Sequence, residues 1–371
     1  MKRLSVMILM LSAAAAALSG AFFFLERTIS PDTQGSGFLE FGRGSKALAS
    51  RTLNEFKKNE RENDFELSYR WKDFSGRDCR ATFSLVKAQI VEAEREFGYS
   101  QEELDQHLKP YEDKLKLEQI ASLRAYLRDQ MAKSPYGRYM ALEDKNPLTF
   151  DLKISAPEEV RDEARTEFRR LQAGLAKEQE RWLSKMKKEL EAQQETFFKS
   201  RGLRVNSGQI SVNYEFCVRQ NKPRVRQAFL AIRDSRENFN LNDFLSVLLA
   251  FVQEIRHENP PLQEGQRNIL GFWVPPRVLA DNSGDCDSKG ATFASLWTNF
   301  KNYPVLILKI PEHLFVGLAI PSVMTEGTLT LRGLRYTLCE VVGPEGFPPG
   351  MISAYSWSYL QSGRFQYELI D

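Results

Sequence analysis

The sequence predicts an α+β fold in which helices and strands occupy largely separate stretches of the chain. Residues 65–71 and 81–86 alternate apolar and polar side chains, which is typical of half-buried antiparallel strands. A charged stretch, 155–202, carries apolar residues at every third or fourth position and therefore indicates a helix. We expect a small α+β amino-terminal module at 46–154, a long helical arm at 155–202 and a mixed α+β domain at 203–371.

Composition excludes several classes of protein. The 371 residues are 42% hydrophobic and 27% charged, which excludes a wholly disordered chain and a polytopic membrane protein. Lys and Arg total 51 against 49 for Asp and Glu, so no net field indicates a nucleic-acid partner. Four cysteines cannot form a disulfide scaffold in a chain of this length. No metal-ligand spacing or phosphate loop is present, so we expect neither a metal nor a cofactor.

The amino terminus has the pattern of an export signal. Lys2 and Arg3 precede an uncharged run, 4–25, and the small residues before position 22 permit cleavage after Ala21. The run has 22 residues and would extend roughly 33 Å as a helix, enough to cross a bilayer core. We expect 1–25 to be either a cleaved signal peptide or an uncleaved anchor that contacts the membrane. Either reading places the rest of the chain outside the cytoplasm, most simply in a bacterial periplasm.

A linker and the amino-terminal module follow this segment. Residues 26–45 are rich in Gly and Ser and are predicted to be the linker. The two alternating runs in the module, separated by Ser75-Gly76, predict a hairpin. A capping box at 100–103 opens a helical stretch that Pro110 should bend or break, and 150–154 is predicted to be a short strand.

The helical arm begins with a second capping box at 155–158 and should end near Gly202. Its apolar residues form one stripe on a charged rod. An intramolecular helix pair, a spacer and a coiled-coil surface for a protein partner would all produce this pattern.

In the domain that follows the arm, we expect a strand at 209–218 and a helix at 241–258. Three more strands are predicted at 305–310, 313–320 and 329–342.

The segment around Cys286 carries the clearest chemical signal. Gly284 permits a tight turn and Asp285 is a good N-cap, so Cys286 should lie at the amino terminus of a helix. The helix dipole there favours the thiolate, which is the reactive form. The carboxylates of Asp285 and Asp287 oppose it, so a separate base is needed to form an ion pair.

His313 and Glu340 are the candidate partners of this thiol. His313 opens an apolar strand, and antiparallel strands behind the cysteine-bearing helix could bring its imidazole to Cys286 as the general base. Glu340 lies in the next apolar strand and could orient the imidazole and stabilise its charged form. Cys286, His313 and Glu340 thus have the order and context of a catalytic triad, on one helix and two strands.

These segments resemble a known family. Gly-Asp-Cys-Asp-Ser-Lys at 284–289, Glu-His-Leu-Phe-Val at 312–316 and Cys-Glu-Val-Val-Gly-Pro at 339–344 resemble the transglutaminase-like cysteine hydrolase superfamily, and its exported bacterial members in particular. The resemblance covers about 205–371. It implies a papain-like core in which the cysteine accepts an acyl group, the histidine is the base and an acid, more often Asp than Glu, orients it.

Other residues have weaker claims on function. Catalysis of this kind needs an oxyanion donor, and the candidates are the backbone N–H of Cys286 and the side chain of Gln253, which resembles a recurring position in bacterial relatives. A surface glutamine is the alternative interpretation of Gln253. Trp273 and Trp297 either wall the cleft or belong to the core. The remaining cysteines, Cys79, Cys217 and Cys339, are expected to be structural. The remaining histidines, His107 and His257, are expected to lie on the surface.

The sequence thus predicts thiol-dependent hydrolysis of a peptide or isopeptide bond in a protein or peptide substrate. Two alternatives remain open at this stage. One is a catalytically silent binding module of the cell envelope, with the arm docking a partner. The other is a protein-crosslinking acyltransferase, for which nothing in the sequence specifies an amine site.

Overall fold

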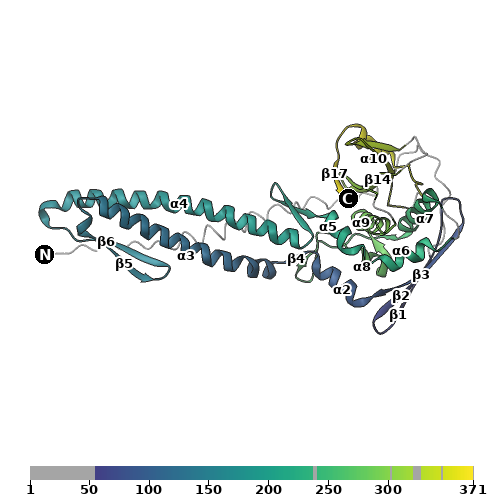
Figure 1. Cartoon of the computed structure of the whole chain (residues 1–371), viewed down its shortest axis with the longest axis horizontal. Helices are drawn as coiled ribbons and strands as arrows, with labels where there is room; N and C mark the ends of the chain where they lie inside the picture. The colour runs from purple at the N-terminus through teal and green to yellow at the C-terminus, as the bar shows by residue number, and fades with distance from the viewer. Residues whose placement is uncertain (1–54, 237–239, 301–302, 321–326, 344–345, 371) are drawn as a thin grey trace. The chain divides into compact units, whose positions relative to one another are not determined.

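The computed structural model describes residues 55–370, apart from 237–239, 301–302, 321–326 and 344–345 (Figure 1). The predicted signal or anchor segment, 1–25, and the linker, 26–45, lie outside the described residues. The architecture is mixed α+β, as expected from the sequence.

The described chain divides into two compact units. The helical unit comprises residues 101–197 and 205–210, and the mixed unit comprises 55–100, 198–204 and 211–370. This division differs from the expected ranges, because 55–100 clusters with the carboxy-terminal part of the chain. The reason lies in long-range packing, described below, that no local pattern reveals.

The helical unit is built on two long helices. The helix predicted for 155–202 is confirmed as α4, preceded by one 3-10 turn. The elements in chain order are α3 (Gln101–Lys133), η1 (Gly137–Tyr139), β5 (Met140–Asn146), β6 (Thr149–Ile154), η2 (Glu158–Val160) and α4 (Arg161–Ser200). Strands β5 and β6 pair as an antiparallel hairpin.

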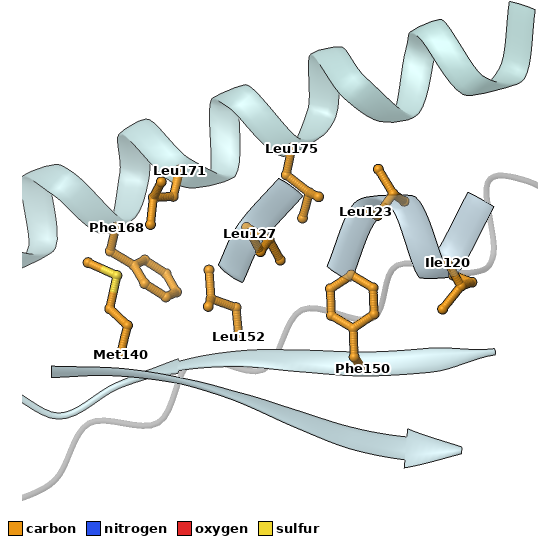
Figure 2. Close-up of a cluster of buried hydrophobic side chains, with 9 residues drawn as sticks. All are labelled: Ile120, Leu123, Leu127, Met140, Phe150, Leu152, Phe168, Leu171 and Leu175. Carbon is orange, nitrogen blue, oxygen red and sulfur yellow. The ribbon is translucent and has the colours of Figure 1, made fainter. Parts of the chain in front are cut away.

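A cluster of buried apolar side chains holds α3, α4 and the β5–β6 hairpin together (Figure 2). Leu127 of α3 is 0% exposed, and Leu171 and Leu175 of α4 are each 1% exposed. Burying a side chain of this size contributes about 1.5–3 kcal/mol. The apolar stripe of α4 is therefore used, along this stretch, for packing within the unit. The full cluster is Ile120, Leu123, Leu127, Met140, Phe150, Leu152, Phe168, Leu171 and Leu175.

Pro110 was expected to bend or break this helix, and it does not break α3. The helix runs through it from Gln101 to Lys133. A proline removes the hydrogen bond to the carbonyl four residues earlier, here that of Gln106. Both Pro110 and Gln106 are exposed, so water can satisfy the freed carbonyl without desolvation.

The mixed unit contains the remaining helices and most of the strands. Its amino-terminal elements are β1 (Glu55–Glu60), β2 (Asp64–Lys72), β3 (Asp78–Val86), α2 (Lys87–Glu96) and β4 (Tyr99–Ser100). Hairpin β7 (Leu203–Asn206) and β8 (Gln209–Val212) has residues in both units. Next come α5 (Tyr214–Asn221), α6 (Arg226–Arg233), α7 (Leu241–Glu254), β9 (Arg256–His257), β10 (Gln263–Glu264), β11 (Arg267–Asn268), α8 (Pro275–Asp281), β12 (Ser283–Gly284) and α9 (Cys286–Trp297). The last elements are β13 (Val305–Ile310), β14 (His313–Leu318), β15 (Thr328–Leu331), β16 (Leu334–Cys339), α10 (Ala354–Gln361) and β17 (Gln366–Ile370).

A five-stranded antiparallel sheet forms one part of this unit, in the order β15-β16-β14-β13-β17. Helix α9 packs against β14, the central strand (Figure 1). A second, three-stranded antiparallel sheet is formed by β1, β2 and β3, which confirms the predicted hairpin of β2 and β3.

The three-stranded sheet packs on α7 of the same unit. The indole Nε1 of Trp71 donates to the carbonyl of Val247 at 3.2 Å, and the rings of Tyr69 and Trp71 lie against Phe251 at 5.0 and 5.1 Å. Trp71 is 1% exposed. These contacts explain why residues 55–100 belong with the carboxy-terminal elements rather than forming a separate module with 101–154.

Two local expectations in this unit are corrected. The run 209–218 was predicted to be one strand, but β8 ends at Val212 and α5 begins at Tyr214, because the side chain of Asn213 caps the helix by accepting from the Phe216 N–H. The helix predicted for 241–258 ends at Glu254, after which β9 begins.

Candidate active site

Cys286 lies at the amino terminus of α9, as predicted. Strand β12 pairs in parallel with β9 and brings Gly284 beside His257, directly before the helix. Asp285 is the N-cap, and its carboxylate accepts from the Ser288 N–H at 2.9 Å. The first-turn N–H groups of a helix lack carbonyl partners within the helix, so the Cys286 N–H keeps its expected place as a candidate oxyanion donor.

The thiol of Cys286 lies where three elements meet. Its sulfur donates to Asp287 Oδ1 at 3.6 Å, and Asp287 Oδ2 accepts from the hydroxyl of Tyr214, on α5, at 2.6 Å. The backbone N–H of Leu314, on β14, is close enough to this sulfur to lower its pKa. The sulfur is therefore placed beside the residue that follows His313 in the chain.

The electrostatics around the thiol favour its neutral form. Burial, with the charges of Asp287 and Asp285, raises the pKa of Cys286 well above its ordinary value, against the lowering effect of the Leu314 N–H. Burial and the charge of Asp287 also raise the pKa of Asp285 to about 6. Formation of a thiolate here thus requires a cation close to the sulfur.

His313 and Glu340 are in direct contact. His313 is the first residue of β14 and pairs with Ile310 across a two-residue turn, in which Glu312 has a φ of 59°. Its Nε2 lies 2.6 Å from Glu340 Oε1. Because a carboxylate only accepts, Nε2 carries the proton, and Nδ1 is the nitrogen left with a lone pair.

The charge of Glu340 stabilises a protonated His313. Burial lowers the pKa of His313, but the hydrogen bond from Nε2 to Glu340, the charge of Glu340 and that of Asp287 outweigh it, so the pKa is raised overall. Glu340 therefore makes the imidazolium form of His313 more stable than it is in a free histidine.

Glu340 lies one residue beyond β16 rather than inside a strand. The run 329–342 was expected to be a single strand, but it forms β15 and β16, joined by a turn at Arg332 and Gly333, both with positive φ. Glu340 is 2% exposed. No strand pairing fixes it, so its position depends on contacts from other elements.

Gln253 provides one of these contacts. Its Nε2 donates to the carbonyls of Glu340 at 2.7 Å and Phe347 at 2.8 Å, while its Oε1 has no hydrogen-bond partner among the described residues. Both amide hydrogens therefore bind backbone oxygens and tie the end of α7 to the segment that bears Glu340. The predicted oxyanion role of Gln253 would require these two bonds to be released, and it stays a prediction.

Lys289 is a site residue that sequence reasoning missed. It lies three residues after Cys286, is 1% exposed, and donates to the carbonyls of Gln253 at 3.3 Å and Ile255 at 2.5 Å, at the end of α7. Burial lowers its pKa to about 8. The available signal was a lysine followed by a run of small and apolar residues, where a solvated position would be unusual.

The approach of α9 to β14 depends on Gly290. A Cβ at Gly290 would lie 2.3 Å from Leu314 Cδ2, so any larger residue would require Leu314 to shift. Since Leu314 is 0% exposed and has little room to shift, this close packing sets the spacing between the helix and the strand that bears His313.

His257 lies nearer to the site than expected. Its side chain is exposed on β9, and it lines a cavity of about 220 Å³ together with Gln253, Lys289 and Gly343. Partial burial, the charge of Lys289 and that of His313 lower the pKa of His257, against a hydrogen bond to Asn259. His107 lies in the helical unit, where its ring packs 5.2 Å from that of Phe197.

The remaining cysteines and tryptophans are structural in position. All four cysteines lie in the described part of the chain, and each is a free thiol; Cys79, Cys217 and Cys339 are buried. Trp297 is 0% exposed and stacks on Phe293 and Phe244, so it belongs to the core. Trp273 is 7% exposed, and its backbone N–H donates to Ser288 Oγ at 3.0 Å.

Among the described residues, no group of three or more His, Cys, Asp or Glu side chains is arranged to hold a metal ion. None of the helices in this same part of the chain combines the length and apolar character needed to cross a membrane. Comparisons with protein-family models, curated proteins and solved structures gave no match.

Proposed function

We propose that this chain is a thiol-dependent amide hydrolase that cleaves a peptide or isopeptide bond. The observation that supports it most directly is the 2.6 Å bond between His313 Nε2 and Glu340 Oε1, at the start of the strand against which the helix of Cys286 packs. Three residues chosen from sequence order thus lie on adjoining elements, and the bond at Nε2 leaves the lone pair of a neutral imidazole on Nδ1.

The reaction proceeds in two stages. The thiol proton moves from Cys286 to His313 Nδ1, the sulfur attacks the amide carbonyl carbon, and the C–N bond breaks as His313 returns the proton to the leaving amine. Water, deprotonated by His313, then hydrolyses the thioester and restores the thiol. Glu340 holds the imidazole and stabilises its charge in each stage, and the Cys286 N–H donates to the developing oxyanion.

We also propose that the mixed unit has a papain-like core. In this interpretation α9 supplies the nucleophile from its first turn, and the antiparallel strands behind it supply the base and the acid. The packing of α9 on β14, and the place of β14 between β16 and β13, support this assignment. The proposed site of action is outside the cytoplasm, with an envelope protein or peptide as substrate, on the basis of residues 1–25.

The first test is the rate of iodoacetamide alkylation of Cys286 against pH, in the full chain and in its His313→Ala variant. Mass spectrometry of the peptide bearing Cys286 separates this thiol from the three buried ones. Fast labelling at pH 6 that is lost without His313 is the expected result, because only a thiolate–imidazolium pair reacts there. Labelling at the rate of an ordinary thiol, unchanged in the variant, would overturn the proposal.

A binding module without catalysis is the second candidate, and one observation favours it. The thiol donates to Asp287, and the surrounding carboxylates hold its pKa high, as suits an unreactive cysteine. In that case Cys286→Ala leaves partner binding intact and the thiol is slow to alkylate at every pH below its pKa. The alkylation experiment therefore separates the two candidates.

A further inference from the structure

The carboxylate of Glu340 is held by a second group besides His313. Oε1 is bound by the imidazole, whereas Oε2 accepts from the hydroxyl of Ser356, on α10, at 3.3 Å. We propose that Ser356, supported by Ser353, is a positioning residue that fixes the Glu340 carboxylate and thereby keeps the His313 imidazolium stable. This inference rests on the proposed function for its catalytic consequence, but not for its structural one.

The directions of the hydrogen bonds follow from the number of available protons. Ser353 Oγ lies 2.9 Å from Ser356 Oγ and also accepts from the Ser356 N–H at 3.0 Å. Since Glu340 as a carboxylate only accepts, the single hydroxyl proton of Ser356 goes to Oε2. The Ser353 proton is then donated to Ser356 Oγ, so the chain runs from Ser353 through Ser356 to Glu340, and each bond polarises the next.

Helix capping alone does not account for Ser356. Ser353 is the N-cap of α10, and it needs only the Ser356 backbone N–H for that purpose. The Ser356 side chain is 0% exposed, so no solvent competes for its hydroxyl. A buried hydroxyl costs free energy unless it is bonded, and here its proton is directed at the one acidic side chain of the candidate triad.

Helix α10 is itself fixed on the five-stranded sheet. Tyr355, Tyr359 and Leu360 pack against the buried cluster that includes Phe315 of β14 and Leu338 of β16. The hydroxyl of Ser356 is thus carried on an element that is anchored to the same strands as His313. With Oε2 held by Ser356 and the Glu340 carbonyl held by Gln253, Oε1 is left facing the imidazole.

The test uses Ser356→Ala in the full chain, with Ser358→Ala as the matched control. Ser358 is an exposed serine of the same helix whose hydroxyl donates to the Tyr355 carbonyl. The first readout is the pKa of His313 by NMR titration, which is tractable with three histidines and is assigned with His313→Ala. The second is the alkylation rate of Cys286 at pH 6.

Removing the Ser356 hydroxyl lets the carboxylate rotate away from His313. We expect the His313 pKa to fall by about half a unit to one unit and the alkylation rate to drop roughly threefold to tenfold, as for the loss of one charge-assisted hydrogen bond. Ser358→Ala should change neither quantity. In a Glu340→Gln background, Ser356→Ala should produce no further change in the His313 pKa, because its effect passes through that carboxylate.

An unchanged His313 pKa in a folded Ser356→Ala protein would overturn the inference. It would also be overturned if Ser356→Ala shifted the His313 pKa equally in the wild-type and Glu340→Gln backgrounds. If Ser356→Ala does not fold, Ser356→Cys keeps the volume and only a weak donor, and the titration of His313 gives the same decision. If wild-type alkylation proves independent of His313, the proposed function fails. The NMR titration still decides whether Ser356 acts on His313 through Glu340.

Discussion

Helices α4 and α9 are stabilised in opposite ways. Along its 40 residues, α4 buries one stripe of apolar side chains and exposes the charged side chains between them. The 12 residues of α9 include ten buried ones, and Ser288, Lys289 and Ser295 are among these. The first pattern is what packing alone requires.

The second pattern costs free energy that packing does not repay. A buried lysine and buried hydroxyls are destabilising unless each is bonded, and a core helix would be more stable with apolar residues in their place. Ser288 and Lys289 lie within one turn of Cys286, and Ser295 lies about two and a half turns away. The difference indicates that packing alone accounts for α4, whereas the polar groups in the first turns of α9 are held by hydrogen bonds to other elements.

The largest effect is expected from breaking the apolar cluster of the helical unit. Leu127→Ala should lower the free energy of unfolding of this unit by about 2–5 kcal/mol, because it leaves a cavity between α3 and α4. Cys286 alkylation should be unaffected. Leu117→Ala, at a position 52% exposed on the same helix, is the control and should cost little. Hydrogen exchange of α3 and α4 measures the change in unfolding free energy for both variants. An equal loss of stability in the two would mean that the buried cluster does not stabilise the unit more than an exposed leucine does.

Lys289→Met tests the cost of the buried charge in α9. The lysine has a pKa of about 8 in the folded chain against 10.5 for a free side chain. At a pH between these two values, Lys289 is protonated in the unfolded chain and neutral in the folded one. Stability therefore rises by about 3 kcal/mol as pH increases from 8 to 10.5, and this gain is lost again as pH falls from 10.5 to 8. Urea unfolding of wild type relative to the Met variant should show this rise. A constant difference across that range would exclude it.

Asp287→Asn should sharpen the contrast at the thiol itself. The carboxylate of Asp287 accepts the Cys286 proton and raises the pKa of that thiol. Without it, alkylation of Cys286 at pH 8 should be roughly threefold to tenfold faster. Asp285→Asn is the matched control, since it also removes one charge but keeps an N-cap residue and does not contact the sulfur. A larger effect from Asp285 than from Asp287 would contradict the assigned contact.

The smallest effect is expected on the charged face of α4. Glu191→Gln removes an exposed ion pair with Lys187, whose atoms lie 3.8 Å apart. Its cost in unfolding free energy should be less than about 0.5 kcal/mol. A larger cost, measured by urea unfolding, would mean that this face makes contacts beyond solvent.

The same contrast explains which features could be predicted from sequence. Periodicity and capping residues specify local structure, so α4, the β2–β3 hairpin and the start of α9 at Cys286 were predicted correctly. Asn213 is the single residue between β8 and α5. Because 209–218 alternates apolar and polar residues, the sequence predicted one strand there and the N-cap at Asn213 was not recognised. The break expected at Pro110 does not occur, because Pro110 and Gln106 are exposed and water can bind the carbonyl that the proline leaves without a partner.

The candidate site could be predicted from sequence only for the three residues nominated as a triad. Cys286, His313 and Glu340 carry recognisable chemistry, and their order along the chain was sufficient to nominate them. Tyr214, Lys289 and Ser356 act through contacts between residues far apart in sequence, and nothing in their local pattern distinguishes them. The joining of 55–100 to the mixed unit was hidden for the same reason, since it depends on Trp71 meeting α7.

The two-residue turn between β13 and β14 has an evolutionary consequence. Because side chains alternate along a strand, adding or deleting one residue between Ile310 and His313 would turn every side chain of β14 to the opposite face. His313 would leave Glu340, and the buried residues that follow it would exchange the two covered faces of the sheet and lose their present partners. Homologous chains that retain this chemistry should therefore vary the identity of Pro311 and Glu312 while conserving their number. Insertions should accumulate instead at the Arg332–Gly333 turn, which precedes β16 and displaces no residue of the site.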